Sequence, residues 1–150
     1  MKNKGPLSGI KVIDLTAMVS GPVCTMMLGD QGADVIKIEP LSGELMRNVG
    51  SQNNGMTTSF LCSNRSKRSL TLNLKNKNGI NILKKLLKTS DVLVQNFRPG
   101  AMTRMGLNYK EVKKINKNII YTSISGFGEN GPYSKQRVYD PVIQALSGLA

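Results

Sequence analysis

Residues 92–100 read VLVQNFRPG, an apolar strand that runs directly into a polar loop, and a further arginine, Arg104, follows about one helical turn later. In an open α/β sheet, ligands bind where the strands end, because backbone N–H groups and the dipole of the next helix point there. Guanidinium groups beside an aromatic ring and an amide suit phosphates, a purine and an amide chain. The segment therefore predicts an anion-binding strand end for a ligand the size of coenzyme A. A surface loop with solvated arginines and a buried Phe97 is the alternative interpretation.

The same alternation of strand, loop and helix recurs along the chain. Hydrophobic periodicity predicts strands at 10–15, 35–39, 69–74, 92–94 and 119–124, and helices at 20–28, 78–88, 109–116 and 140–150. Ser20 precedes Gly-Pro and is expected to cap the first helix, while Pro40 ends the second strand. This spacing predicts an α/β fold, a parallel sheet with helices on both faces.

The chain has 150 residues, enough for one domain with a full core. Its last predicted helix ends in LSGLA without a polar tail, so we expect residues 1–150 to be part of a longer protein. The first residues lack the apolar core of a signal peptide, and no stretch approaches the length of a membrane span. Cys24 and Cys62 suggest neither a disulfide framework nor a metal site, which favours a cytoplasmic location.

The formal charge of +12, from 21 basic and 9 acidic residues, raises nucleic-acid binding as an alternative. The lysines, however, are spread over the solvent faces of the helices predicted at 78–88 and 109–117. The four tyrosines and three phenylalanines do not interleave with them as a stacking platform would. We therefore expect no nucleic-acid partner, and a polyanionic ligand would also be attracted by such a field.

Several stretches, in the correct order, are similar to one family. They are LSGIKVIDLT at 7–16, LGDQGADVIKIE at 28–39, NRSKRSL at 64–70, DVLVQNFRPG at 91–100 and ISGFG at 124–128. The chain resembles the amino-terminal part of class III coenzyme A transferases, a family that includes formyl-CoA transferase, carnitine-type CoA transferases and α-methylacyl-CoA racemase. The resemblance implies a Rossmann-like sheet, an interlocked homodimer, acyl-CoA and a carboxylic acid as substrates, and no permanently bound cofactor or metal.

The resemblance also implies a set of CoA-binding residues at the strand ends. By position they are Val19, Ser20, Leu72, Asn73, Leu74, Lys75, Asn96, Phe97, Arg98, Arg104 and Arg137. Arg104 and Arg137 are expected to bind phosphates, whereas Lys75 is also typical of a solvated strand end. Pro40 stands where relatives often carry a basic residue. For Asn96 a turn-forming role is the alternative, and for Phe97 packing in the core.

In such transferases an aspartate attacks the acyl-CoA thioester, giving a mixed anhydride and then an aspartyl-CoA thioester. The family's nucleophile is expected beyond residue 150, in a part that also supplies the second domain. Asp140 is the substitute within the chain, although a helix N-cap is its structural alternative. Tyr139 and Asp140 are expected to line the site.

Tyr139 also separates the two branches of the family. Racemases that resemble this chain place a histidine there as an acid/base group, and this chain has no histidine. The sequence therefore favours a transferase over a racemase, with an inactive CoA-binding fragment as a further alternative.

Overall fold

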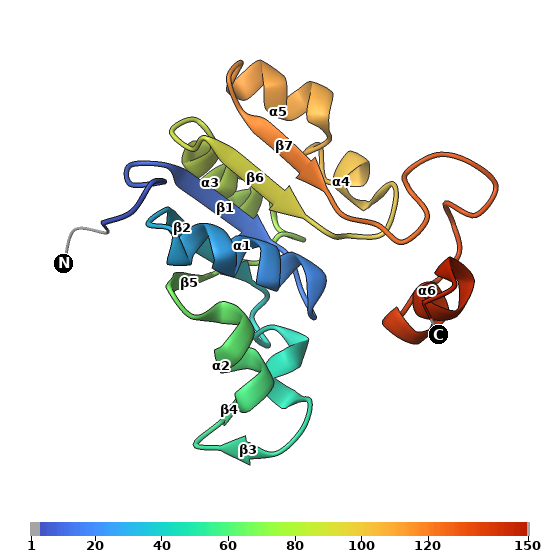
Figure 1. Ribbon diagram of the computed structural model, residues 1–150. Helices are drawn as coiled ribbons and strands as arrows, with labels where there is room; N and C mark the ends of the chain where they lie inside the picture. Colours follow the sequence, from blue (N-terminus) through green and yellow to red (C-terminus); the bar gives the residue numbers. More distant parts are fainter. Residues whose placement is uncertain (1–3, 150) are drawn as a thin grey trace.

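The computed structural model describes residues 4–149, and its centre is a five-stranded parallel sheet (Figure 1). The sheet order is β5-β2-β1-β6-β7, and adjacent strands are parallel throughout. The strands are β1 (Lys11–Leu15), β2 (Asp34–Glu39), β5 (Lys67–Thr71), β6 (Val92–Gln95) and β7 (Ile120–Ser123). The predicted parallel α/β sheet is confirmed.

The order of the strands reverses direction between β1 and β6. From β1 the chain adds β2 and β5 on one side, and then returns to add β6 and β7 on the other. The carboxyl ends of β1 and β6 are therefore neighbours whose connections lead away in opposite directions. Such a switch point is where open α/β sheets bind their ligands.

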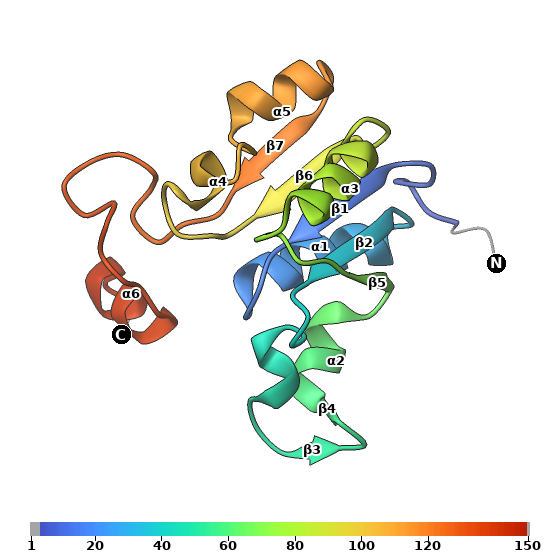
Figure 2. The ribbon, with the colours of Figure 1, turned by 180° about the vertical axis from the view of Figure 1, so that it is seen from behind.

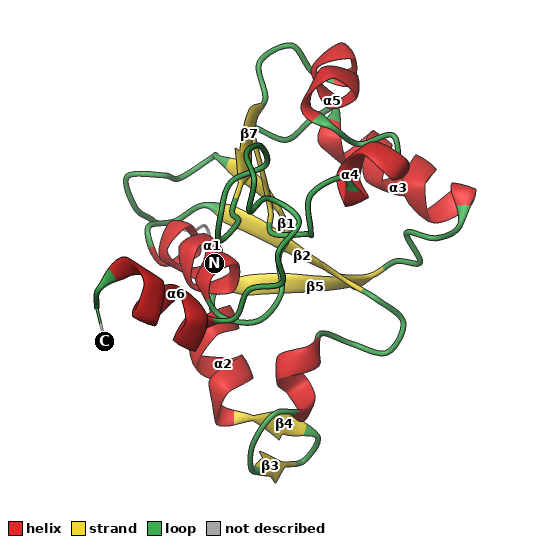
Figure 3. Ribbon diagram, turned by 90° about the vertical axis from the view of Figure 1, so that its right-hand side faces the viewer, coloured by secondary structure: helices red, strands yellow, loops and turns green. Residues whose placement is uncertain are grey.

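Helices cover both faces of the sheet, as predicted. Figure 3 shows α1 (Ser20–Asp30) on one face and α3 (Lys77–Leu87) with α5 (Tyr109–Ile115) on the other. Alternate residues of the strands face the two layers: Ile13 and Leu93 join the core beneath α3 and α5, and Val12 and Val94 join the core on the other side. The central strands are thus buried on both faces, which requires every side chain in them to be apolar or paired.

The segment between β2 and β5 forms elements that the sequence did not predict. They are η1 (Leu45–Asn48), the short hairpin of β3 (Gln52–Asn53) and β4 (Met56–Thr57), and α2 (Thr58–Asn64). Figure 2 shows this segment projecting from one side of the sheet. Each of these elements is too short for hydrophobic periodicity to reveal.

Three other boundaries differ from the prediction. β5 spans Lys67–Thr71 instead of 69–74, because Leu72 already lies past the ladder, buried in the core. A short helix that was not predicted, α4 (Ala101–Arg104), follows the β6 loop. The last helix, α6 (Asp140–Ser147), ends before 150 because Gly148 adopts the left-handed conformation that ends helices, with φ +78°. Among the described residues, no helix is long and apolar enough to cross a membrane.

Candidate functional site

The loops that leave β1 and β6 are joined by one side chain. The Asn96 amide Nδ2 donates to the Ala17 carbonyl at 2.8 Å, and the Ala17 N–H donates to Asn96 Oδ1 at 2.9 Å. This two-point contact bridges 79 positions of sequence and places both loops side by side at the switch point. Asn96 therefore fixes the neighbouring loop, a role different from the turn-forming alternative.

The residues next to this contact are exposed. Val19 is 56% exposed and Phe97 37%, and Ser20 and Arg98 are exposed as well. The alternative of a Phe97 packed in the core is therefore wrong, and its ring is available at the carboxyl edge of the sheet. The Phe97 N–H donates to the buried Gln95 side chain at 2.8 Å, which holds the backbone beneath the exposed ring.

The amino terminus of α1 lies in the same place. The helix begins at Ser20, as predicted, but Ser20 is its first helical residue and not its cap. The cap position is Val19, which supplies no side-chain hydrogen bond. The expected serine cap is thus wrong, because Ser20 already belongs to the helix and Val19 occupies the cap position. The positive end of the helix dipole is left without a capping oxygen at the switch point.

The predicted phosphate ligands are exposed arginines. Arg98 follows Phe97, Arg104 ends α4, and Arg137 lies in the long loop between β7 and α6. Within residues 4–149, no ion pair or side-chain hydrogen bond neutralises any of these three guanidinium groups. Arg98 lies in the connection from β6 to α4, and Arg104 lies at the end of α4. No described contact links Arg137 to the other predicted residues.

Residues 72–75 begin the connection from β5 to α3. Leu72 is buried and Leu74 is half-buried, so their side chains belong to the core. Asn73 Oδ1 accepts the Lys75 N–H at 3.0 Å, and Lys75 itself is exposed. Only Asn73 and Lys75 of this predicted group present polar side chains to solvent.

Asp140 does not cap α6, so that alternative is wrong. The cap position is Tyr139, which makes no side-chain hydrogen bond, and Asp140 is the first helical residue. Its carboxylate accepts a hydrogen bond from Gln144 one turn later on the same helix. Tyr139 is 64% exposed. Both side chains are therefore accessible, on an element that lies beyond the carboxyl ends of the strands in Figures 1 and 2.

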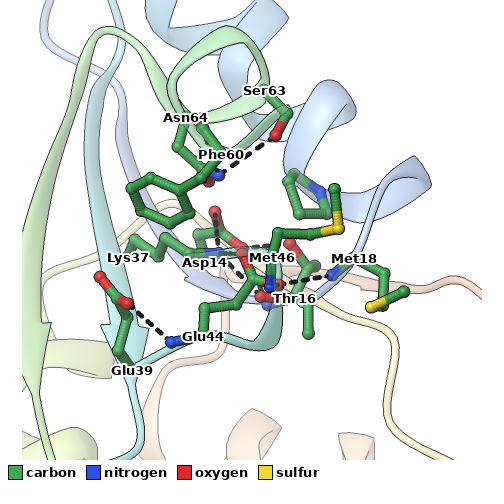
Figure 4. A network of polar contacts seen from close by, with 12 residues as sticks. Asp14, Thr16, Met18, Lys37, Glu39, Glu44, Met46, Phe60, Ser63 and Asn64 are labelled. Carbon is green, nitrogen blue, oxygen red and sulfur yellow. Dashed lines mark hydrogen bonds and ion pairs between the residues drawn. The ribbon is translucent and has the colours of Figure 1, made fainter. Parts of the chain in front are cut away.

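A buried polar cluster beneath the β1 loop was missed by the sequence analysis (Figure 4). Asp14 in β1 is fully buried and accepts hydrogen bonds from Thr25 at 2.7 Å and from Lys67 at 2.9 Å. Lys37 in β2 is 1% exposed, and its Nζ lies 4.0 Å from Asp14 Oδ2 and 3.8 Å from Glu44 Oε2. Two lysines and two carboxylates thus balance in charge. Burial lowers the pKa of Lys67 despite the attraction of Asp14.

A second ion pair, between buried Glu39 and partly exposed Arg47, lies beside this cluster. Arg47 of η1 donates both Nε and Nη2 to Glu39 at 2.7 Å, and Ser69 donates to the same carboxylate at 2.6 Å. Burial alone would raise the pKa of Glu39, but the hydrogen bonds from Arg47, Ser69 and the Glu44 backbone outweigh it and lower the pKa to about 2. Glu39 is therefore held as a carboxylate.

The sequence carried one signal for these clusters. A strand in the middle of a parallel sheet with helices on both faces has no solvent side, so a charged residue within it must be buried and paired. Lys37 and Glu39 in β2 meet that condition. Their partners, Glu44 and Arg47, lie in the segment whose structure was not predicted.

A cavity of about 720 Å³ adjoins Arg98 on the β7 side of the sheet. Its lining includes Arg98, Gly100, Thr103, Tyr121 and Glu129. Burial and then the charge of Glu129 raise the pKa of Tyr121 to about 12, so its hydroxyl stays protonated and donates to the Leu107 carbonyl at 3.1 Å. Because Arg98 lines this cavity, a ligand group can lie next to its guanidinium.

Comparison with known proteins shows the family of the chain. Residues 7–150 match the family described as CoA-transferase family III. The chain is 44% identical to the human succinyl-CoA:glutarate CoA-transferase, covering 99% of this chain and 34% of that protein. It is 45% identical to the acetyl-CoA:oxalate CoA-transferase of Acetobacter aceti, covering 99% and 38%.

A solved structure gives the same result for the fold. A CAIB/BAIF family protein from Brucella suis superposes with a TM-score of 0.91 at 38% identity, over 96% of this chain and 39% of that one. The chain spans little more than a third of the length of the relatives it matches. Because the family match covers nearly all of its residues, the chain belongs to CoA-transferase family III.

Proposed function

We propose that this chain binds coenzyme A at the carboxyl edge of its sheet and forms the CoA-binding part of an enzyme that transfers CoA from an acyl-CoA to a carboxylic acid. The observation that carries the proposal is the switch point itself. Asn96 ties the β1 loop to the β6 loop, and exposed Phe97 and Arg98 stand next to the uncapped start of α1. An aromatic face, guanidinium groups and a helix amino terminus are the groups that bind a nucleotide.

We assign roles within this site by chemistry. Arg98, Arg104 and Arg137 would pair with the phosphates, since guanidinium groups bind phosphate oxygens in a two-point geometry. Phe97 would stack on the adenine. Val19 and Ser20, with Asn73 and Lys75 on the far side, would flank the rest of the cofactor. Leu72, Leu74 and Asn96 would shape the site through the backbone that they hold.

In the proposed reaction, an aspartate carboxylate attacks the thioester carbonyl, which forms an acyl-aspartyl anhydride and releases the CoA thiolate. The thiolate attacks the aspartyl carbonyl, giving an aspartyl-CoA thioester and the free first acid. The acceptor carboxylate then attacks this thioester, which forms a second anhydride and releases the CoA thiolate. The thiolate attacks the acceptor's acyl carbon, giving the new acyl-CoA and the free aspartate carboxylate. We place the nucleophile outside residues 1–150, with Tyr139 and Asp140 lining the site. We further propose that the intact enzyme is an interlocked homodimer in the cytoplasm.

A racemase is the alternative within the family. Moving a proton from the α-carbon requires a base and an acid with pKa values near neutrality. Tyr139 occupies the position expected for a histidine, and the unperturbed pKa of tyrosine, about 10, makes it a poor proton shuttle. The chain contains no histidine elsewhere. This composition supports the transferase over the racemase.

The proposal is tested by titrating the protein with CoA in a calorimeter and repeating the titration with Arg104→Ala. Because Arg104 has no protein partner among residues 4–149, its loss should cost little stability and act on the ligand. We expect CoA binding to weaken by about 1 to 3 kcal/mol, the size of a charge-assisted contact.

The matched control is Arg65→Ala, which removes the same side chain from the opposite edge of the sheet. Arg65 lies before β5 and pairs with Asp30 at 2.7 Å, away from the switch point. Its loss should leave the affinity for CoA unchanged. An equal loss of CoA affinity in the two variants would indicate a general effect of charge. In that case, displacement of CoA by a single-stranded oligonucleotide would favour the nucleic-acid alternative. No heat of binding by the wild type would overturn the proposal.

A further inference from the structure

The backbone of the β1–α1 loop is held by side chains from three separate places. The Thr16 carbonyl accepts a hydrogen bond from Lys37 Nζ at 2.9 Å, and the Met18 N–H donates to Glu44 Oε1 at 2.8 Å. Asn96 holds Ala17 between them. Lys37 comes from β2 and Glu44 from the turn that follows it, as Figure 4 shows. Successive residues of the loop are therefore fixed by the protein interior.

Met18 adopts a conformation that it would not choose by itself. Its φ is +68°, in the left-handed region that side chains other than glycine, asparagine and aspartate disfavour. An isolated loop would relax to a negative φ, which would turn the Met18 N–H and redirect Val19 and Ser20. The hydrogen bond from Met18 to Glu44 opposes that relaxation. The direction in which α1 begins thus depends on a residue 26 positions later.

Capping η1 alone does not explain a buried carboxylate at position 44, because burying its charge costs free energy. It is 2% exposed, and while Oε1 accepts from both Met18 and Met46, its buried Oε2 has no hydrogen-bond partner. A buried carboxylate oxygen without a donor is unfavourable, and a neutral acceptor would cap η1 equally well. Lys37 offsets the charge from 3.8 Å. The same lysine also holds Thr16, so the Glu44–Lys37 pair acts on both ends of the loop.

We propose that Glu44, together with Lys37, is a positioning residue of the CoA site. Glu44 touches no ligand. It holds Met18 in the left-handed conformation, and thereby sets where the N-terminus of α1 and the Val19–Ser20 backbone meet the cofactor. The inference rests on the proposed CoA binding and goes beyond it, because it assigns a binding function to the buried turn between β2 and η1.

The test compares substitutions at both ends of the contact. Glu44→Gln keeps the shape but replaces Oε2, which faces Lys37 Nζ at 3.8 Å, with an NH2 group. Two donors then face each other, so the side chain must turn away from Lys37 and its hydrogen bond from Met18 weakens. Amide hydrogen exchange, read by NMR, should quicken at Met18 in this variant, while Ala17, which Asn96 holds, stays protected. The affinity for CoA should fall about tenfold, the effect of releasing one strained residue.

Arg47→Gln is the matched control. It breaks the neighbouring pair with Glu39, and no described hydrogen bond or ion pair joins the Arg47 side chain to the β1–α1 loop. Measured well below the melting temperature of both variants, it should lose stability without losing affinity for CoA. A loss of affinity in Arg47→Gln equal to that in Glu44→Gln would reduce the role of Glu44 to general stability and overturn the inference.

Substitutions of Met18 test the inference even if Glu44→Gln does not fold. Glycine adopts a positive φ without strain and valine resists it, so Met18→Gly should keep its affinity within about threefold while Met18→Val loses about tenfold. The reverse order would show that the Met18 side chain acts and not its backbone. If the wild type binds no CoA, the proposed function fails and the inference with it. If the wild type binds and both sets of variants bind equally, only the inference fails.

Discussion

At the level of single residues, the interior of this protein is unusually polar for a parallel sheet. Asp14, Lys37, Glu39 and Glu44 are each at most 2% exposed, and all lie on β1, on β2 or on the turn that follows. A buried pair adds little stability compared with apolar packing, but removing one partner leaves a charge without compensation. Asp14, Lys37 and Glu44 each bind the backbone of residue 16 or 18, so these three hold the β1 loop in place. Glu39 has no partner in that loop and acts on the fold through Arg47 and Ser69.

The decrease in the free energy of unfolding at low pH should depend on Glu39. Its pKa is lowered from 4.5 to about 2, so the folded protein binds its proton less readily than the unfolded chain does. The stabilisation is therefore fully present above about pH 5 and is lost as the pH falls through about 2, with a size of about 3 kcal/mol. In urea titrations the wild type should have a larger free energy of unfolding than Glu39→Gln at pH 5 and above, and this difference should shrink as the pH falls toward 2.

The control for this pH series is Glu111→Gln, which removes an exposed carboxylate on α5 that pairs with Lys114 in solvent. The free energy of unfolding of this variant should fall with pH as that of the wild type does, since solvent screens the pair. A difference in the free energy of unfolding between wild type and Glu39→Gln that stays constant from pH 7 to pH 2 would contradict the role given to Glu39.

At the level of elements, what could be predicted from the sequence follows the length of each pattern. α3 shows Leu83 and Leu87 on one buried face, and β6 is a continuous apolar run, so both were located within two residues. β5 was misplaced because Leu72 and Leu74 continue its apolar alternation past the last paired residue. The 41–64 segment consists of turns and short elements. Glu44, Arg47 and Thr57 hold it through bonds to Met18, Glu39 and the Met46 carbonyl, which are 26, 8 and 11 positions away and follow no local pattern.

The same limit applies to the candidate site. The loop residues around Phe97 and Arg98 could be proposed from their place after an apolar strand, and the switch point brings Ala17 beside them. The role of Asn96 could not be predicted, because its partner is 79 residues away. Glu44 was missed for the same reason, since its contact with Met18 depends on tertiary structure.

The start of α3 makes a specific element-level prediction. Gly79 lies in the first turn of the helix, and a Cβ there would collide with the Asn73 carbonyl, part of the loop predicted to bind CoA. Alanine is normally better than glycine in a helix by about 1 kcal/mol. Gly79→Ala should nevertheless destabilise the protein by about 1 to 3 kcal/mol, because the backbone of the 72–75 segment must move.

Chemical denaturation measures this change, and Asn81→Ala is the control on the same helix. Asn81 is exposed, so alanine there should follow the helix propensity and be neutral or slightly stabilising. A Gly79→Ala variant as stable as Asn81→Ala would show that α3 and the 72–75 segment are not in close contact.

At the level of the whole molecule, two surfaces remain open within residues 4–149. α6 has no buried residue, and its Leu146 is 68% exposed. The second surface is β7, a strand at one edge of the sheet, whose Ile120 is 62% exposed. Large exposed apolar side chains on a helix and on a sheet edge are typical of contact surfaces. Both loops of the switch point, which Asn96 joins, lie within these residues.

This arrangement leads to a prediction about catalysis. The 150-residue chain should bind CoA, because both switch-point loops are present, but should transfer no CoA between any pair of acids. The proposed anhydride hydrolyses unless a closed site excludes water, and the proposed nucleophile lies outside these residues. The purified chain is incubated with an acyl-CoA and a second carboxylate, and the products are followed by mass spectrometry. Hydroxylamine is then added to trap any aspartyl thioester as a hydroxamate.

Asp140→Asn is the decisive control for this experiment. Asp140 is exposed at the start of α6 and is the one carboxylate on that helix, so it is the residue to which a trapped hydroxamate would map if the chain were active alone. We expect neither turnover nor a hydroxamate in the wild type or in the variant. Turnover that disappears in Asp140→Asn would identify Asp140 as the nucleophile, and the catalytic aspartate would then lie within this chain and not outside it.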